Sequence, residues 1–195
     1  MHLSKVYFSI LFIVITLVSC TIPDMTDEPI VNELDSYEVI QHHSEVEEGD
    51  FLFRLYTDQP EQIEGEFVSL KGEIVYIGDE AEIEISHTDE PISFHIEEKI
   101  RGYSLPYLIK EIGAYTTLTK NEPYKVTFNR AQIAPLENED KKEKHFIEEF
   151  LERDDFPVGY YEVIGMFDFF ITDPEVPEDE AHIEFETKID FKVTN

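Results

Sequence analysis

The sequence contains a single cysteine, no tryptophan and only 15 lysine and arginine residues in 195. One cysteine excludes an internal disulfide, so a folded domain here has to be stabilised by its hydrophobic core. Because the chain has 44 acidic residues and only 15 basic ones, the formal net charge is −29. Such a charge disfavours nucleic acid and anionic lipid surfaces as partners and favours cations and basic proteins. Solubility alone also explains strong acidity, so the charge does not define a site.

Motifs of common catalytic chemistry are absent as well. The chain has no Gly-x-Ser-x-Gly, no His-Glu-x-x-His and no phosphate-binding loop. No pair of carboxylates can be singled out for hydrolysis among 44 acids. We therefore expect no catalytic residue, no cofactor and no enzyme activity. The alternative is a metal-dependent protein or a hydrolase whose site is assembled from scattered acids and histidines.

The first residues have the pattern of an export signal. Lys5 precedes thirteen mostly apolar residues, 6–18, which are too few to span about 30 Å of hydrocarbon comfortably but suit a signal peptide. The tetrapeptide Leu-Val-Ser-Cys that ends at Cys20 resembles the lipobox of bacterial lipoproteins. That resemblance implies that residues 1–19 are removed, and that lipid on Cys20 holds the protein on the extracytoplasmic face of the cell membrane. The alternatives are an ordinary secretory signal or an N-terminal membrane helix.

Residues 20–48 are expected to form an acidic, disordered tether. After Cys20 this segment holds nine acids, two prolines and no lysine or arginine, a composition that cannot bury enough apolar surface to fold. His42 and His43 lie in this segment. They are interpreted as a solvated pair, which is a simpler interpretation than a weak transition-metal site. The folded domain is then predicted to cover residues 49–195.

That domain is predicted to be mainly β. Short runs with apolar residues at every second position, separated by turn signals, fit an antiparallel β-sandwich. These runs are residues 51–57, 68–76, 81–87, 92–96, 116–118, 124–129, 160–171 and 181–193. Gly72 inside the second run indicates a bulge or a close approach of another backbone segment. Apolar residues at both parities of 160–171 predict a strand that is buried on both faces, or on one face and under the helix.

The last run has the cleanest alternation, which assigns each residue to a face. The core face is expected to carry Ala181, Ile183, Phe185, Ile189, Phe191 and Val193, and the solvent face His182, Glu184, Glu186, Lys188, Asp190 and Lys192. One helix is expected over residues 138–153, capped by Asn138. Its apolar stripe of Phe146, Ile147, Phe150 and Leu151 is expected to pack on the sandwich.

A weak family resemblance accompanies this layout. Leu118-Thr-Lys-Asn-Glu-Pro precedes one strand, and Pro157-Val-Gly-Tyr-Tyr-Glu-Val-Ile-Gly introduces a late one. The arrangement over about residues 50–193 resembles bacterial immunoglobulin-like domains and the proteinase-inhibitor domain of the BsuPI type. The resemblance implies an immunoglobulin-like sandwich and adds proteinase inhibition as an alternative function. Residues 98–121 and 138–153 depart from the pattern, so no residue is assigned an inhibitory role.

The strongest candidate for a metal site is an acidic loop near the C-terminus. Its carboxylates, which are oxygen ligands of the kind Ca²⁺ prefers, belong to Asp173, Glu175, Glu178, Asp179 and Glu180. Their spacing does not match a calcium-binding EF-hand, and a solvated acidic loop is the simpler interpretation. His87 continues an apolar strand face and is expected at the edge of the core, whereas His95 is expected to be exposed.

These observations together favour a membrane-anchored extracytoplasmic lipoprotein that acts as a binding or interaction module. Its expected partners are the membrane, through the lipid on Cys20, and an exported protein. Nucleic acid is not expected as a partner, and the sequence leaves the oligomeric state open.

Overall fold

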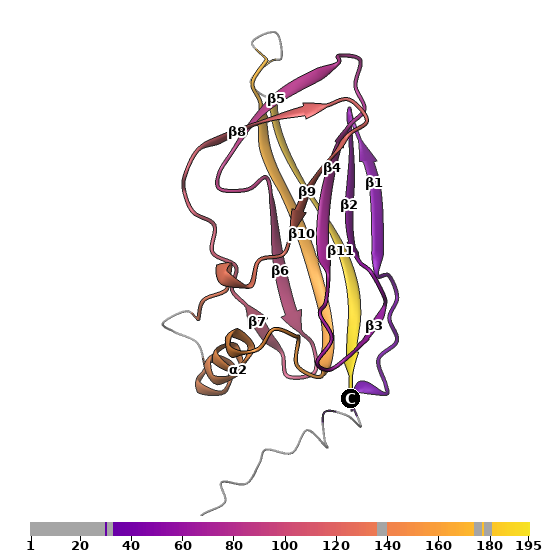
Figure 1. The fold of residues 1–195 in the computed structure, drawn as a ribbon, viewed down its shortest axis with the longest axis vertical. Helices are drawn as coiled ribbons and strands as arrows, with labels where there is room; N and C mark the ends of the chain where they lie inside the picture. The colour runs from indigo at the N-terminus through magenta and orange to yellow at the C-terminus, as the bar shows by residue number, and fades with distance from the viewer. Residues whose placement is uncertain (1–29, 31–32, 136–139, 174–176, 178–180) are drawn as a thin grey trace, which may run out of the picture.

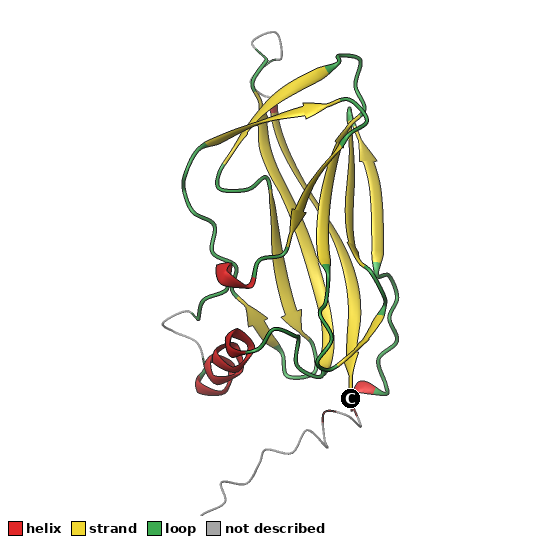
Figure 2. Cartoon of the chain, in the orientation of Figure 1, coloured by secondary structure: helices red, strands yellow, loops and turns green. Residues whose placement is uncertain are grey.

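The computed structural model describes residues 30, 33–135, 140–173, 177 and 181–195. This part of the chain is dominated by strands, with one regular helix at its side (Figure 2). The strands are β1 (His43–Glu48), β2 (Phe51–Thr57), β3 (Glu61–Ile63), β4 (Leu70–Tyr76), β5 (Glu82–His87), β6 (Ile92–Glu98), β7 (Tyr103–Leu105), β8 (Ala114–Thr119), β9 (Pro123–Thr127), β10 (Gly159–Ile171) and β11 (His182–Thr194). The helices are the short 3₁₀ helix η1 (Arg130–Gln132) and α2 (Lys141–Glu152).

The strands form two sheets that pack face to face (Figure 1). The first sheet has the order β1-β2-β4-β9, and the second has the order β3-β11-β10-β5-β8, with β6 pairing β10 and β7 pairing β6. The pairing of β3 with β11 is parallel, and the other strand pairings are antiparallel. The predicted mainly β, immunoglobulin-like sandwich with one inserted helix is thereby confirmed.

Phenylalanine and tyrosine rings fill the space between the sheets. The ring of Phe53 on β2 lies 4.8 Å from that of Phe167 on β10 and 4.9 Å from that of Phe185 on β11. Further down the same strands, Tyr161 and Phe191 stack with their centroids 5.1 Å apart. Offset and edge-to-face ring pairs of this kind stabilise a core beyond the area they bury. The core face assigned to the last run is therefore correct, although Phe185 is only half-buried.

Gly72 in β4 pairs regularly with both neighbouring strands, so it marks no bulge, and the group that approaches it closely is a side chain rather than backbone. A Cβ atom built on this glycine would lie 2.8 Å from Cγ2 of Ile92, which belongs to β6 of the opposite sheet. Real Cβ atoms essentially never come this close to another heavy atom. The absence of a side chain at Gly72 therefore allows Ile92 to fill this part of the core.

Helix α2 packs on the sandwich through the predicted apolar stripe. Phe146, Ile147 and Phe150 are buried, and Phe146 lies beside Tyr103 of β7. The helix begins at Lys141, and Asp140 caps it by accepting a 2.8 Å hydrogen bond from the Lys142 amide. The expectation that Asn138 is the cap is therefore wrong. An aspartate at this position places a negative charge at the positive end of the helix dipole, which asparagine does not.

The N-terminal boundary of the folded unit differs from the prediction. The described part of residues 20–48 is ordered, with Leu34 buried and residues 43–48 forming strand β1 on the edge of the first sheet. The prediction of a disordered tether as far as Glu48 is thus wrong for residues 33–48, while Cys20 and the residues that follow it to 29 lie outside the described part. The acidic composition alone predicts disorder, but it does not take into account the contacts that residues of β10 and β11 make with this segment.

Two contacts account for that ordering. Asp190 on β11 accepts hydrogen bonds of 2.7 Å from the backbone amides of Ile40 and Gln41. The ring of Tyr37 stacks on Tyr160 of β10 at a centroid distance of 4.6 Å. Asp190 was assigned to a solvent face, but only 6% of it is exposed. The segment before β1 therefore covers the outer face of the second sheet at this point.

The long strands β10 and β11 connect two distinct ends of the molecule (Figure 1). The C-terminus and the first described residues lie together at one end, which we call the proximal end. Strands β5 and β8, the last residues of β10 and the first residues of β11 lie at the other, the distal end. Among the residues described, no helix has the length and apolar character needed to cross a membrane.

Candidate functional site

Several of the residues that the sequence singles out lie outside the described part of the chain. This applies to Cys20 and to four acids of the candidate calcium loop, namely Glu175, Glu178, Asp179 and Glu180. Asp173, the remaining member of that loop, is exposed. Within residues 30, 33–135, 140–173, 177 and 181–195, no three acids, histidines or cysteines converge in a way that suits a metal ion.

Two histidine predictions are confirmed. His87 is 8% exposed and has hydrogen-bond partners on both ring nitrogens, with Nδ1 2.5 Å from the Thr88 carbonyl and Nε2 2.8 Å from the Thr116 hydroxyl. It is thus a satisfied residue at the edge of the core. His95 on β6 is exposed on the outer face of the second sheet, as expected. Partial desolvation lowers the pKa of His95 below the usual histidine value, which favours its neutral form at pH 7.

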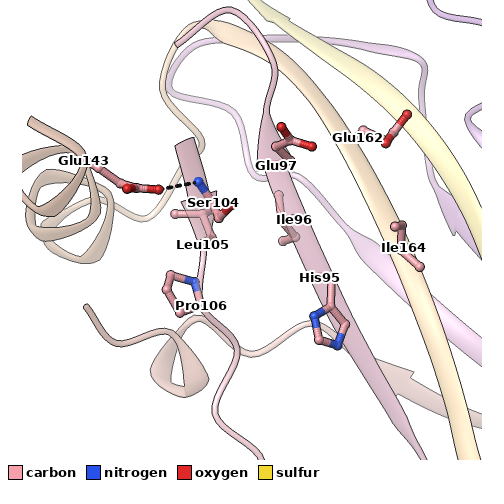
Figure 3. A pocket seen from close by; sticks show the side chains of 9 residues that line it. All are labelled: His95, Ile96, Glu97, Ser104, Leu105, Pro106, Glu143, Glu162 and Ile164. Atoms are coloured by element: carbon pink, nitrogen blue, oxygen red, sulfur yellow. Dashed lines mark hydrogen bonds between the residues drawn. The ribbon is translucent and has the colours of Figure 1, made fainter. Parts of the chain in front are cut away.

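A groove of about 480 Å³ runs between this outer face and β7 with α2 (Figure 3). His95, Glu97, Glu162 and Ile164 of β6 and β10 line one side of it. The other side is made by Ser104, Leu105, Pro106 and Glu143. The groove therefore brings one histidine and three carboxylates to one place, the kind of cluster in which catalysis is sought.

The carboxylates of this groove are already engaged within the chain. Glu143 accepts a 2.9 Å hydrogen bond from the Ser104 amide, which ties α2 to the edge strand β7 (Figure 3). Glu97 pairs with Lys99 at 2.8 Å, and Glu162 pairs with Lys188 at 2.9 Å. The Glu143 contact positions α2, and the two ion pairs balance charge on the sheet surface. The three carboxylates therefore have structural roles.

A different surface stands out at the distal end, where aromatic side chains are exposed in a row. The strand register places Tyr115 of β8 opposite Ser86 of β5, Ser86 opposite Phe170 of β10, and Phe170 opposite His182 of β11. Residues that are directly opposite in paired strands share a face, so all four lie on the outer face of the sheet. We call Tyr115, Phe170 and His182 the aromatic row.

The aromatic row combines exposure with a fixed geometry. Tyr115 is 71% exposed and Phe170 is 46% exposed, although both lie on paired strands. His182 stacks on Phe170 with centroids 4.3 Å apart, and its Nε2 lies 2.8 Å from Oδ1 of Asp168. Exposed aromatic side chains that neighbouring strands hold side by side in this way are typical of interaction surfaces.

A second groove, of about 580 Å³, adjoins the row on the edge side of β11. It opens where the first strands of one sheet face the last strand of the other, and we call it the seam groove. Its lining combines apolar side chains with acids and consists of Glu48, Gly49, Asp50, Phe51, Ile171, His182, Ile183, Glu184 and Phe185. The seam groove and the aromatic row share His182, so they form one continuous surface.

Sequence reasoning missed this surface for an identifiable reason. Apolar residues at both parities of 160–171 predicted burial on both faces of that strand. Burial on both faces holds at Tyr160 and Tyr161 but not at Phe170, which reaches solvent. Predicting the row requires the register that aligns Phe170 with Tyr115 and His182 on neighbouring strands. That register is not visible in a single sequence.

No family model and no curated protein matches the chain.

Proposed function

We propose that the protein is a lipid-anchored lipoprotein on the extracytoplasmic face of the cell membrane that acts by binding an exported protein. The observation that carries the binding role is the aromatic row of Tyr115, Phe170 and His182, exposed on paired strands at the distal end of the sandwich. The membrane location rests on the sequence pattern that ends at Cys20.

The chemistry of the row suits protein recognition. Tyrosine and phenylalanine rings supply a large contact area and lose little conformational freedom when they are held by strands. Asp168 and Glu184 are exposed beside the row on β10 and β11. Together with the net charge of −29, these acids accelerate the approach of a basic partner and disfavour an anionic one.

Chemical crosslinking on intact cells tests the proposal. The wild-type chain is expected to form a crosslinked product with one exported protein, and the Tyr115→Ser/Phe170→Ser variant is expected to lose it. The Phe67→Ser variant is the matched control because Phe67 is 69% exposed but lies in the segment between β3 and β4. Equal products from all three proteins, or substrate turnover that disappears when one acid or histidine is changed, would contradict a binding role for the row.

A further inference from the structure

Strand β11 has a backbone edge that other described residues cover at its proximal end only. It pairs with β10 along its length, whereas β3 pairs with it only over residues 192–194. The amides of Asp190 and Lys192 donate away from β10, to the carbonyls of Gln41 at 2.8 Å and Pro60 at 2.9 Å. Antiparallel ladders alternate in direction, so the amides of Glu184, Glu186 and Lys188 point the same way. Within the described residues, no strand pairs with β11 on that side at Glu184 and Glu186.

The neighbouring strand β1 approaches this edge and then leaves it open. The hydroxyls of Ser44 on β1 and Thr187 on β11 form a 2.7 Å hydrogen bond, which closes the seam between the two sheets. Beyond that contact, toward the distal end, the seam groove begins between residues 48–51 and residues 182–185. The free backbone edge and the groove therefore occupy the same stretch of β11.

A strand added to this edge would meet two different environments on its two faces. On the outer face, its side chains would lie beside Glu184 and Glu186, which are exposed. On the inner face, they would enter the seam groove above the half-buried Ile183 and Phe185. Because side chains alternate along a strand, the matching segment has basic and apolar residues in alternation.

We propose that β11 binds an extended segment of an exported protein as an additional strand over residues 183–186, and that this segment alternates basic and apolar residues. The inference rests on the proposed binding function and specifies its partner. Backbone hydrogen bonds at Glu184 and Glu186 provide affinity, and the groove and the two carboxylates provide specificity. A second copy of this chain is disfavoured because its own β11 edge would bring acids against acids.

Titration of the full chain in detergent with a short peptide that alternates lysine and valine tests this proposal. Three control peptides are compared with it: one with lysines and valines in separate blocks, one with glutamate in place of lysine, and one N-methylated at every amide so that it cannot donate to a ladder from either edge. The alternating peptide is expected to bind and to slow exchange of the Glu184 and Glu186 amides. The double substitution Glu184→Lys/Glu186→Lys is expected to weaken its binding by about tenfold or more.

The matched control protein is Glu148→Lys/Glu152→Lys, which changes the net charge equally on the exposed face of α2. It is expected to bind the alternating peptide as the wild type does. Failure of the alternating peptide to bind, equal binding of the N-methylated peptide, or equal weakening by both double substitutions would overturn strand addition. Because the crosslinking experiment does not use this peptide, a crosslinked partner with no peptide binding would reject strand addition and leave the binding function standing.

Discussion

The carboxylate of Asp190 accepts a 2.6 Å hydrogen bond from the hydroxyl of Tyr160 on the neighbouring strand β10. The same carboxylate accepts hydrogen bonds from the amides of Ile40 and Gln41, so one buried acid joins two strands of the sandwich to the segment that leads into β1. Burial, and after it the hydrogen bond to Asp190, raise the pKa of Tyr160 well above the usual tyrosine value, which keeps its hydroxyl a donor throughout the physiological range.

Asp190→Ala should destabilise the fold and release the N-terminal segment. Removing the acceptor leaves the amides of Ile40 and Gln41 without this partner and leaves the Tyr160 hydroxyl with a long, 3.5 Å contact to the Glu38 carbonyl. We expect a loss of about 3 kcal/mol in the free energy of unfolding. Urea titration measures that loss, and amide exchange of Ile40 and Gln41 reports the release. The control Glu184→Ala removes an exposed acid of the same strand and should change stability by about 0.5 kcal/mol or less. Slow exchange of both amides in the Asp190 variant would show that other contacts hold the segment.

Asp155 should make part of the stability depend on acid pH. Arg153 donates to both of its carboxylate oxygens, at 2.9 and 2.7 Å, and the Gly65 amide donates to one of them at 2.7 Å. Chiefly through the Arg153 contacts, the pKa of Asp155 falls from 3.8 to about 2. The folded state then binds fewer protons than the unfolded state, so this contribution is complete above about pH 4 and is lost as the pH falls toward 2.

Asp155→Asn isolates that contribution. At pH 6 the variant should be less stable than the wild type by about 2 kcal/mol; most of this difference should be lost by about pH 2, and the remainder below it. Denaturant unfolding of both proteins across this range gives the comparison. A difference that stays constant with pH would show that Asp155 has the same pKa in the folded and unfolded states.

Substitutions of Phe191 and Phe170 should have different effects, the first on stability and the second on partner binding. Phe191 is fully buried against Tyr161 and Phe156, so Phe191→Ala should cost about 3–5 kcal/mol. Phe170 is 46% exposed, and Phe170→Ala should cost less than about 1 kcal/mol while weakening partner binding. Thermal or urea unfolding gives the two stabilities. A larger loss for the Phe170 variant would mean that the row is part of the core rather than a binding surface.

Cys20→Ala should abolish lipid attachment. The thioether to lipid requires the thiol of this residue, since the chain has no other cysteine. We expect the wild-type protein in the detergent phase on phase partitioning and the variant either unprocessed or in the aqueous phase. A variant of normal mature size that still enters the detergent phase would refute the anchor at Cys20.

How far the sequence alone predicts this fold depends on how local the determining contacts are. The alternation over residues 181–193 is local and assigns Phe191 to the core correctly. It fails at Asp190, because the covering segment lies about 150 residues away along the chain. Strand β1 has little apolar alternation, yet Glu48 pairs with Phe51 across Gly49 and Asp50. A glycine followed by an aspartate between two runs is a recognisable signal for a two-residue hairpin. In this sequence it is the local feature that indicates β1.

The candidate surface was harder to predict than the fold. Tyr115, Phe170 and His182 belong to three strands, and only the register across β5 aligns them. The open edge of β11 depends in the same way on where β3 and β1 end their contacts with it. Both features are properties of pairing between distant segments, which composition and periodicity do not encode.

Site-specific photocrosslinking on intact cells tests the central claim most directly. A photoreactive residue at Tyr115, and in a separate protein at Glu184, should each capture the same exported protein. The control position is Thr127, which is exposed on β9 of the opposite sheet. The account predicts products from the first two positions and none from the third. Capture from Thr127 alone, or equally from all three positions, would contradict a binding surface at the distal end of β10 and β11.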